Sequence, residues 1–506
     1  MPSKKSVPSL ARNRKACVLA IDQGTTGTRA IIYNSEGRLL GSAYREITQY
    51  YPKPGWVEHD PEEIWESVRT VTRQALKKCR VQGKNIAAIG ITNQRETTLL
   101  WNKKTGRSVG RAIVWQDRRT TEICDRLKKR GCSPLFRNRT GLVIDPYFSG
   151  TKIHWLLNHK PELRKAASKG QLLFGTIDTW LVWKLTGGKE HVTDFTNASR
   201  TLLLNIQTKK WDDRILKMLR IPKVILPQVK DSGSIFGVTR FQGSLPAGIP
   251  IASILGDQQA ALFGQGCYHK GDSKNTYGTG CFLLTVLGKT YRKPPFGLLL
   301  TLACNEKGKT VYALEGSIFS GGSVIQWLRD GLGFLKSAAE SETLARSVKD
   351  TGGVVLIPAF TGLGAPHWNP RVRGVISGIT RGTTQAHITR AALEAIAHQS
   401  TDIAEVMERK AGIRIHELRV DGGACSNRLL MQMQADLLGK PVLVSSRLES
   451  TAWGAAKLAG KTVKLWPNLD RLDGAGKYKR FKPSMSAGQR QRERACWQQA
   501  LRQLNG

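Results

Sequence analysis

Two segments far apart in the chain share one pattern, in which a polar tip rich in glycine and threonine joins two apolar runs. They are VLAIDQGTTGTRAIIY at 18–33 and NTYGTGCFLLTVLG at 275–288. Short apolar runs bounded by turn residues are typical of buried strands, and glycine allows the tight connection between them. The sequence therefore predicts a β-hairpin with a polar tip in each half of the chain.

The tip of the first hairpin has the groups that a polyphosphate would need. Gly24 and Gly27 expose backbone amides, the neighbouring threonines add hydroxyl donors, and Asp22 could hold a cation. Amide and hydroxyl donors next to a metal-binding carboxylate suit phosphate groups. An ordinary hairpin turn that uses Asp and Gly for geometry would have the same residues, so both interpretations stay open at this point.

The rest of the chain alternates short apolar runs with longer amphipathic ones, as α/β proteins do. Residues 86–94 predict a strand and 61–79 a helix, with Asp60 as cap and Pro61 in the first turn. Apolar residues at helical spacing predict a helix over 171–187. Between 249 and 266 the pattern gives a strand to Leu255 and then a short helix, and we place the main domain boundary there.

A third turn of this kind lies at 418–439, where a short strand meets an Asp-Gly-Gly turn and a helix capped by Ser426 or Asn427. Glycines at a helix start let a phosphate lie against the backbone. The chain has no G-x-x-x-x-G-K-[ST] motif, and no G-x-G-x-x-G follows a strand. A nucleotide would therefore bind through another architecture.

Length and composition favour an α/β protein of two to four units, because 506 residues exceed one ordinary core. No apolar run approaches the ~20 residues of a membrane span, and the basic N-terminus lacks the apolar core of a secretory signal. The nine cysteines form no C-x-x-C pair and no zinc spacing. We therefore expect a soluble cytoplasmic protein with reduced thiols.

The chain is strongly basic, with 78 Lys and Arg against 39 Asp and Glu. Residues 1–15 hold five basic groups and no acid, and residues 477–506 hold eight basic groups and one acid. The remaining charge is spread along the chain, without a zinc finger, an RNA-recognition signature or an aromatic-basic repeat. Non-specific attraction to polyanions is expected, but no dedicated nucleic-acid or membrane module.

Motifs from about residue 16 to 475 together resemble the FGGY family of carbohydrate kinases, and within it the members that phosphorylate glycerol. They are DQGTTGTRA (22–30), YPKPGWVEHDPEEIW (51–65), GITNQRETT (90–98), TGLVIDPYFSGTK (140–152), GTIDTWLVWKLT (175–186), DFTNASRT (194–201), GDQQAALFGQ (256–265), NTYGTGC (275–281), ALEGSIF (313–319), PAFTGLGAPHW (358–368) and RVDGGACSN (419–427).

The resemblance implies the actin-like ATPase fold, which is related to ribonuclease H, with two related α/β domains around a central cleft. It implies transfer of the ATP γ-phosphoryl group to glycerol, giving sn-glycerol 3-phosphate at the entry of glycerol catabolism. We expect a disordered tail at 1–15, an N-terminal domain at 16–255, a C-terminal domain at 256–476 and a basic tail at 477–506. A homodimer or homotetramer is expected.

Residue roles follow from the matched motifs. Asp257 matches the general base, although its position before a helix would equally suit an N-cap. Asp22 matches the carboxylate that orients Mg²⁺ together with Asp257, through water, because Mg²⁺ gives up its hydration reluctantly. Both hairpin tips should face one cleft and bind the phosphates of ATP.

The remaining site residues form a glycerol set and a nucleotide set. By themselves, Trp115 and Phe282 would be read as core residues, and Arg95 with Glu96 as a surface ion pair. In the family pattern the glycerol set is Arg95, Glu96, Tyr147, Asp257 and Gln258, with Trp115 and Phe282 against the carbons. The nucleotide set is Thr25, Thr26, Gly27, Arg29, Thr279, Gly322, Gln326, Gly423 and Asn427.

Two departures from the family pattern concern regulation. The loop FQGSLPAGIP (241–250) has Gly248 where many bacterial relatives place an arginine that binds fructose 1,6-bisphosphate, so inhibition by this sugar is not expected. DSGSIFG (231–237) lacks the histidine that is phosphorylated in other relatives. The alternatives are another polyol or sugar kinase of the family, and an actin-like ATPase or binding protein without kinase activity.

Overall fold

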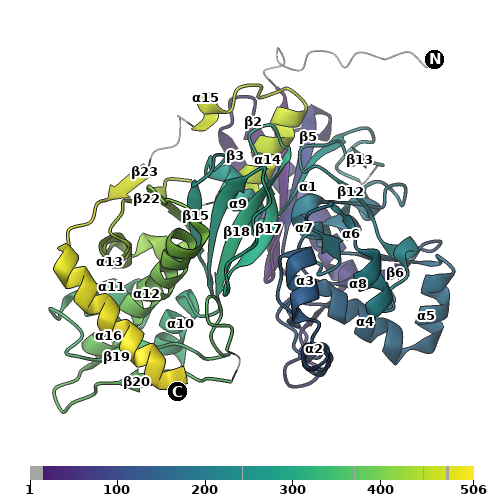
Figure 1. Ribbon diagram of the computed structural model, residues 1–506. Helices are drawn as coiled ribbons and strands as arrows, with labels where there is room; N and C mark the ends of the chain where they lie inside the picture. The colour runs from purple at the N-terminus through teal and green to yellow at the C-terminus, as the bar shows by residue number, and fades with distance from the viewer. Residues whose placement is uncertain (1–14, 242, 370, 448, 474–477, 506) are drawn as a thin grey trace.

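A computed structural model describes residues 15–241, 243–369, 371–447, 449–473 and 478–505. Figure 1 shows two lobes, with the purple-to-teal N-terminal elements on the right and the green C-terminal elements on the left. Each lobe is built around a large mixed sheet. The expected disordered tail at 1–15 falls outside the described residues except for Lys15.

The sheet of the first lobe has six strands in the order β13-β14-β5-β1-β2-β3. The first hairpin is formed by β1 and β2, which pair antiparallel with Asp22 opposite Arg29. β1 pairs parallel with β5, and β5 pairs parallel with β14. The strands are β1 (Cys17–Gln23), β2 (Gly27–Asn34), β3 (Leu39–Glu46), β5 (Ile86–Asn93), β13 (Gly237–Val238) and β14 (Pro250–Gly256).

The sheet of the second lobe has seven strands in the order β17-β18-β16-β15-β21-β22-β23. Its β15 and β16 form the second predicted hairpin, and β15 pairs parallel with β21. The strands are β15 (Ser273–Tyr277), β16 (Cys281–Gly288), β17 (Leu299–Cys304), β18 (Thr310–Ile318), β21 (Leu418–Asp421), β22 (Val442–Ser445) and β23 (Tyr478–Phe481).

Two-stranded sheets and helices surround these central sheets. The small pairs are β4 (Glu58–His59) with β7 (Ala112–Ile113), β6 (Leu99–Asn102) with β8 (Leu172–Gly175), β9 (Val192–Asp194) with β12 (Gln228–Lys230), β10 (Leu204–Asn205) with β11 (Lys210–Trp211) and β19 (Val355–Ile357) with β20 (Val375–Ser377). Short 3-10 turns are η2 (Gly83–Asn85), η3 (Lys223–Ile225) and η4 (Gly423–Ser426).

The helices lie on the faces of the sheets and at the two outer ends of the molecule (Figure 1). In the first half they are α1 (Pro61–Cys79), α2 (Thr121–Lys129), α3 (Ser133–Thr140), α4 (Ser149–His159), α5 (Pro161–Ser168), α6 (Ile177–Leu185), α7 (Phe195–Ala198), α8 (Asp213–Met218) and α9 (Asp257–Gly264). In the second half they are α10 (Gly322–Asp330), α11 (Glu340–Arg346), α12 (Gln385–Ala411), α13 (Arg428–Leu438), α14 (Ser450–Thr462), α15 (Asp470–Asp473) and α16 (Ala487–Asn505).

Several predicted elements are confirmed, and α1 has the predicted ends. The Asp60 side chain accepts hydrogen bonds from the backbone N–H groups of Glu62 and Glu63, which caps the helix. Asn427, one of the two predicted caps, caps α13 by accepting the Leu430 N–H at 2.9 Å. The continuous helix expected over 171–187 is wrong, because its first residues form β8 before α6 begins at Ile177.

A close contact between α9 and α14 joins the two halves of the sequence. A Cβ atom on Gly454 would lie 1.9 Å from the carbonyl oxygen of Ala260, and one on Gly264 would lie 2.1 Å from that of Ser450. The glycines therefore let the two helix backbones approach. α14 also packs on β1, β5 and β14, so a helix from the second half of the sequence covers the sheet of the first (Figure 1).

The C-terminal residues 477–506, expected as a basic tail, contain a strand and a helix instead. β23 pairs antiparallel with β22, and α16 follows it. Trp497 and Leu501 are each 2% exposed and belong to the core of the second lobe. These two residues lie four positions apart, on one helical face. The apolar face was not recognised in the sequence because charged residues surround it.

Candidate active site

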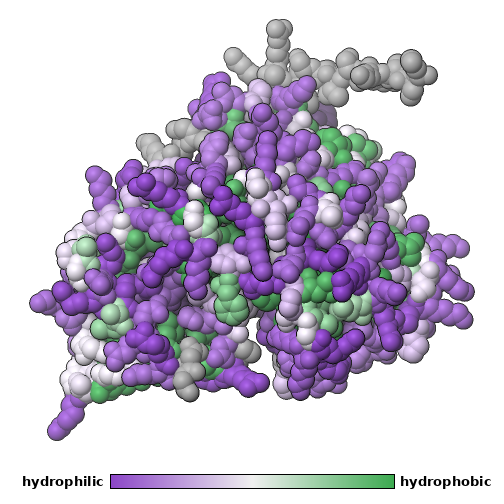
Figure 2. All heavy atoms as spheres, in the orientation of Figure 1, coloured by the Kyte–Doolittle hydropathy of each residue, from purple (hydrophilic) through white to green (hydrophobic). Residues whose placement is uncertain are grey.

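A cavity of about 730 Å³ lies between the lobes, and it brings together predicted residues from both sheets. The space-filling view shows a notch between the two halves at the lower edge of the molecule (Figure 2). The predicted residues that line the cavity are Thr25, Arg95, Glu96, Trp115, Tyr147, Asp257, Thr279 and Phe282. Thr25 lies at the first hairpin tip and Thr279 at the second, so the prediction that both tips face one cavity is confirmed.

Each of the two tips is closed by a backbone hydrogen bond between glycines. Gly24 N–H donates to the Gly27 carbonyl at 2.9 Å, and Gly278 N–H donates to the Gly280 carbonyl at 2.9 Å. A Cβ atom on Gly27 would lie 2.7 Å from the backbone carbonyl oxygen of Arg45, so the backbone leaves no room for a side chain there. Each tip is therefore a tight loop closed by its own backbone, with a threonine beside the cavity.

Asp22 lies at the end of β1 and Asp257 directly follows β14, with β5 between the two strands in the first sheet, and the two carboxylates are close enough to influence each other. Burial and the negative charge of Asp257 raise the pKa of Asp22 to about 7, against a smaller opposing effect of Arg29. Two carboxylates that repel each other are stabilised by a cation between them. The described residues hold no cluster of three or more His, Cys, Asp or Glu suited to a metal. The donor set fits Mg²⁺ that keeps water and phosphate oxygens as its other ligands.

Asp257 is the first residue of α9, and its side chain is 32% exposed, toward the cavity. Its Oδ1 accepts the backbone N–H of Gln258 at 2.7 Å and lies 3.1 Å from Arg95 Nε. The helix cap itself is Gly256. The carboxylate thus accepts one free N–H at the helix start and still faces the cavity, but Asp257 is not the N-cap that its position before a helix also suggested.

Arg95 and Glu96 are not a surface ion pair, because both side chains are 2% exposed. Their charges are separated by 3.9 Å, and each has a stronger partner elsewhere. Arg95 Nη1 donates to Glu315 Oε2 at 2.6 Å, and Glu96 Oε1 accepts from Arg200 Nε at 2.6 Å. Burial raises the pKa of Glu96, and the two arginines oppose this effect.

The aromatic side of the cavity is tied to the first hairpin. Trp115 Nε1 donates to Thr25 Oγ1 at 2.9 Å. The rings of Trp115 and Tyr147 meet edge to face, with centroids 5.5 Å apart. Phe282 lies on β16 and also lines the cavity. Aromatic and charged groups therefore line the same cavity, as a small polyol requires.

Other predicted residues do not line this cavity. Gln258 is 8% exposed and lies behind Asp257. Arg29 forms an ion pair with Glu449 and borders a different, shallow cavity with Tyr44. The structure places the rest on several elements: Asp22 at the end of β1, Thr26 and Gly27 at the first tip, Gly322 and Gln326 on α10, Gly423 in η4, and Asn427 before α13.

Sequence reasoning missed several residues of the cavity and its floor. Arg200 and Glu315 are fully buried and hold Glu96 and Arg95. Glu315 interrupts the apolar run of β18, and such a charge inside a buried strand is a signal that the sequence offers. The further lining residues are Gln116, Arg118, Thr121, Gly280, Ile318, Phe319, Ser320, Ser323, Phe360, Thr361 and Arg373.

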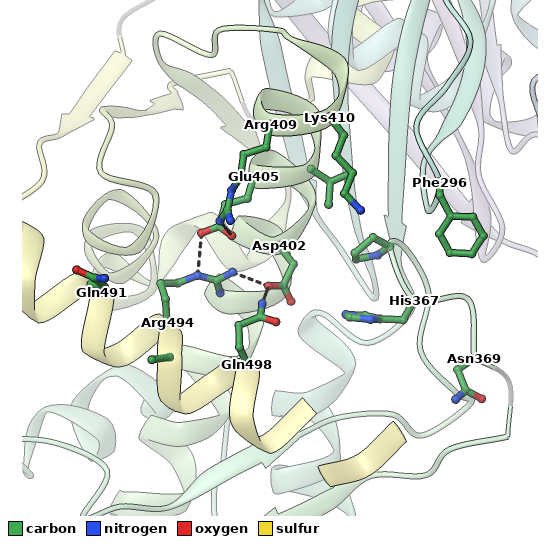
Figure 3. A pocket seen from close by; sticks show the side chains of 13 residues that line it. Phe296, His367, Asn369, Asp402, Glu405, Arg409, Lys410, Gln491, Arg494 and Gln498 are labelled. Atoms are coloured by element: carbon green, nitrogen blue, oxygen red, sulfur yellow. Dashed lines mark hydrogen bonds and ion pairs between the residues drawn. The ribbon is translucent and has the colours of Figure 1, made fainter. Parts of the chain in front are cut away.

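A second cavity of about 690 Å³ lies between α12, α16 and the segment around His367, and no predicted residue lines it (Figure 3). Asp402 accepts hydrogen bonds there from Arg494 Nη2 at 2.5 Å and Gln498 Nε2 at 2.7 Å. Arg494 Nε also donates to Glu405 Oε1 at 3.1 Å. These interactions attach α16 to α12, which is a structural role.

No helix among the described residues is both long and apolar enough to cross a bilayer. The chain matches the model of the FGGY family of carbohydrate kinases, N-terminal domain, over residues 17–264, and that of the C-terminal domain over 273–463. It is 53% identical to a glycerol kinase of Alkalilimnicola ehrlichii, covering 97% of this chain and 98% of the relative. It is 54% identical to a glycerol kinase of Carboxydothermus hydrogenoformans, over 96% and 98% of the two chains.

Solved structures give the same result. The crystal structure of Plasmodium falciparum glycerol kinase with ADP matches with a TM-score of 0.89 and 36% identity, over 97% of this chain and 98% of that one. A gluconate kinase from Lactobacillus acidophilus has a TM-score of 0.84 at 22% identity, over 97% and 96%, and shows the shared fold alone. By sequence and by structure, this chain belongs to the FGGY family of carbohydrate kinases.

Proposed function

We propose that the protein phosphorylates glycerol with ATP, giving sn-glycerol 3-phosphate and ADP. The observation that carries the proposal is the cavity in which Asp257 lies among Arg95, Glu96 and the aromatic wall, with a hairpin tip from each lobe beside it. Relatives that match nearly the whole chain at more than half identity are glycerol kinases, which supports glycerol as the acceptor.

The charged residues of the cavity are suited to bind the hydroxyl groups of a small triol, and the aromatic residues are suited to contact its carbons. Arg95 offers hydrogen-bond donors, Glu96 offers acceptors, and Tyr147 adds a hydroxyl. Trp115 and Phe282 cover the carbon edge and keep water away from it. Because Arg95 and Glu96 are held by buried partners, their positions are set before glycerol enters, which lowers the entropic cost of binding.

Asp257 is proposed as the general base. A glycerol hydroxyl within hydrogen-bond distance of its carboxylate would lose its proton to Asp257 as the oxygen attacks the γ-phosphorus and ADP leaves. Thr25, Thr26, Gly27, Arg29 and Thr279 are proposed to hold the phosphates. Mg²⁺, oriented by Asp22 and Asp257, would supply neutralisation of phosphate charge.

The adenosine is proposed to lie against the second lobe, near Gly322, Gln326, Gly423 and Asn427. The start of η4 and the tight turn at Gly422 support this position, since a turn without side chains lets a flat ring approach the backbone. We further propose a cytoplasmic homodimer or homotetramer. Light scattering of the purified protein measures its mass in solution.

A substrate panel tests the proposed function. Purified protein with ATP and Mg²⁺ should release ADP in the presence of glycerol, and much less with dihydroxyacetone or pentuloses. The phosphorylated product should be sn-glycerol 3-phosphate. Preference for another polyol or a ketopentose would instead assign a different kinase activity of the family, and ADP release independent of any acceptor would indicate an ATPase.

A further inference from the structure

Lys274 is a fully buried lysine directly behind the proposed base. It lies on β15 with 0% exposure, and its ammonium donates to Gln258 Oε1 at 2.5 Å and to Thr276 Oγ1 at 2.8 Å. An ammonium has three donors and no acceptor. The amide of Gln258 must therefore present its oxygen, and not its NH₂ group, to Lys274.

The orientation of this amide determines whether its NH₂ group or its oxygen faces the carboxylate of Asp257. With its oxygen on Lys274, Gln258 turns its NH₂ group toward Asp257, where Nε2 lies 3.4 Å from Oδ2. The backbone N–H of the same glutamine donates to Oδ1 at 2.7 Å. The backbone N–H of Gln258 thus donates to one carboxylate oxygen of Asp257, and its side-chain NH₂ group points toward the other. Because Lys274 holds the amide oxygen, the NH₂ group is the end that faces Asp257.

The charges around Lys274 keep it a donor at neutral pH. Burial lowers the pKa of Lys274 to about 8, and the positive charge of Arg95 contributes to the decrease. The negative charges of three acidic residues act to raise this pKa, in decreasing order Asp421, Asp257 and Glu315. Asp421 is 5% exposed, and among the described residues neither of its carboxylate oxygens accepts a hydrogen bond. It lies opposite Thr276 in the β15–β21 register, on the sheet face of Lys274, where it balances the ammonium charge.

We infer that Lys274 is a positioning residue for phosphoryl transfer, which fixes the amide of Gln258 and through it the carboxylate of Asp257. This inference rests on the proposed function. It assigns Lys274 no contact with glycerol or ATP, since its known partners are Gln258 and Thr276. Loss of the ammonium should therefore lower turnover while nucleotide binding persists.

The first test is Lys274→Met, which keeps the length of the side chain and removes the donors. We expect kcat to fall about 10- to 100-fold, because small misplacements of a reacting group have effects of this size. The KM for ATP should stay within twofold. Lys457→Met is the matched control: Lys457 is also 0% exposed, but it donates to the Phe263 carbonyl at 3.3 Å, away from Gln258. The control should change Tm with little effect on kcat.

A double-mutant cycle separates positioning from a general structural role. If Lys274 acts through Gln258, then Lys274→Met combined with Gln258→Met should be about as slow as Gln258→Met alone. If the fold-decrease in kcat of the double variant equals the product of the two single decreases, the inference is overturned. Both single variants should bind ADP as the wild type does, which confirms that they are folded.

Gln258→Glu provides a test that keeps an acceptor for the buried lysine and adds a negative charge beside Asp257. A glutamate retains an acceptor for Lys274 and loses the NH₂ donor, so Tm should be maintained while kcat falls. Normal kcat in this variant would contradict the inference. Wild-type protein without glycerol-dependent ADP release would refute the proposed function instead, whereas an active wild type with an equally active Lys274→Met variant would refute only the role of Lys274.

Discussion

Arg95 Nη1 lies 2.6 Å from Glu315 Oε2, and this buried ion pair joins the end of β5 in one lobe to β18 in the other. Arg200 Nη2 approaches the second oxygen of the same carboxylate at 3.0 Å. All three side chains are at most 2% exposed. The floor of the active-site cavity is therefore a charge network that spans the lobes and directs Arg95 toward Asp257.

Glu315→Gln should weaken both the fold and the glycerol site. The change removes the carboxylate that both buried guanidinium groups share, while Arg200 keeps Glu96 and Arg95 keeps Asp257. Breaking a buried pair in this way costs about 3–5 kcal/mol. We expect a loss of this order in urea unfolding and a KM for glycerol raised about tenfold or more. Asp213→Asn is the control, because Asp213 pairs with Lys223 on the surface. A Glu315→Gln variant with unchanged stability and KM would contradict the role of the network.

Asp257→Asn should leave ADP binding largely intact and lower kcat by about two to four orders of magnitude, because the amide cannot accept the proton of the hydroxyl. Steady-state kinetics and ADP titration measure the two effects separately. Near-normal turnover would show that another group is the base.

The Mg²⁺ dependence should change with pH in a direction fixed by Asp22. Because the pKa of Asp22 is raised to about 7, its carboxyl is protonated below that pH and loses its attraction for a cation. The Mg²⁺ concentration for half-maximal activity should therefore rise as pH falls from 8 to 6. In Asp22→Asn this dependence should flatten, and an equally steep profile in the variant would rule Asp22 out as the source.

Fructose 1,6-bisphosphate should change activity little at physiological salt. Gly248 supplies no cation at the position where an arginine would bind this sugar, and its φ of +92° is one that side-chain-bearing residues rarely adopt. Initial rates over a range of the sugar provide the measurement. Saturable inhibition would mean that other basic residues form a regulatory site.

The sequence predicted the parts of the fold that have local signals. Both hairpins, α1 and the strand that leads to Asp257 follow from periodicity, caps and glycines close to each element. Residues 171–187 were misassigned, because a short apolar strand before a helix has no periodicity of its own. The strand and helix at the C-terminus were missed because basic residues surround Trp497 and Leu501.

Site residues that lie within a recognisable motif were predictable from the sequence. Contacts that depend on how separate elements pack were not. Thr25, Asp257 and Thr279 meet in one cavity as the motifs imply. That Gln258 lies behind Asp257, with Lys274 behind it, depends on how α9 packs against β15, which no local pattern encodes. The ion pair between Arg29 and Glu449 likewise joins residues far apart in the chain.

The central claim is that Asp22 and Asp257, at the ends of β1 and β14 in the first sheet, act on one magnesium-bound triphosphate with glycerol alongside. A crystal structure with Mg²⁺, glycerol and a non-hydrolysable ATP analogue tests it most directly. We predict the terminal phosphate between Thr25 and Thr279, and a glycerol hydroxyl within hydrogen-bond distance of Asp257. Glycerol bound away from Asp257, or a metal remote from Asp22, would contradict the account.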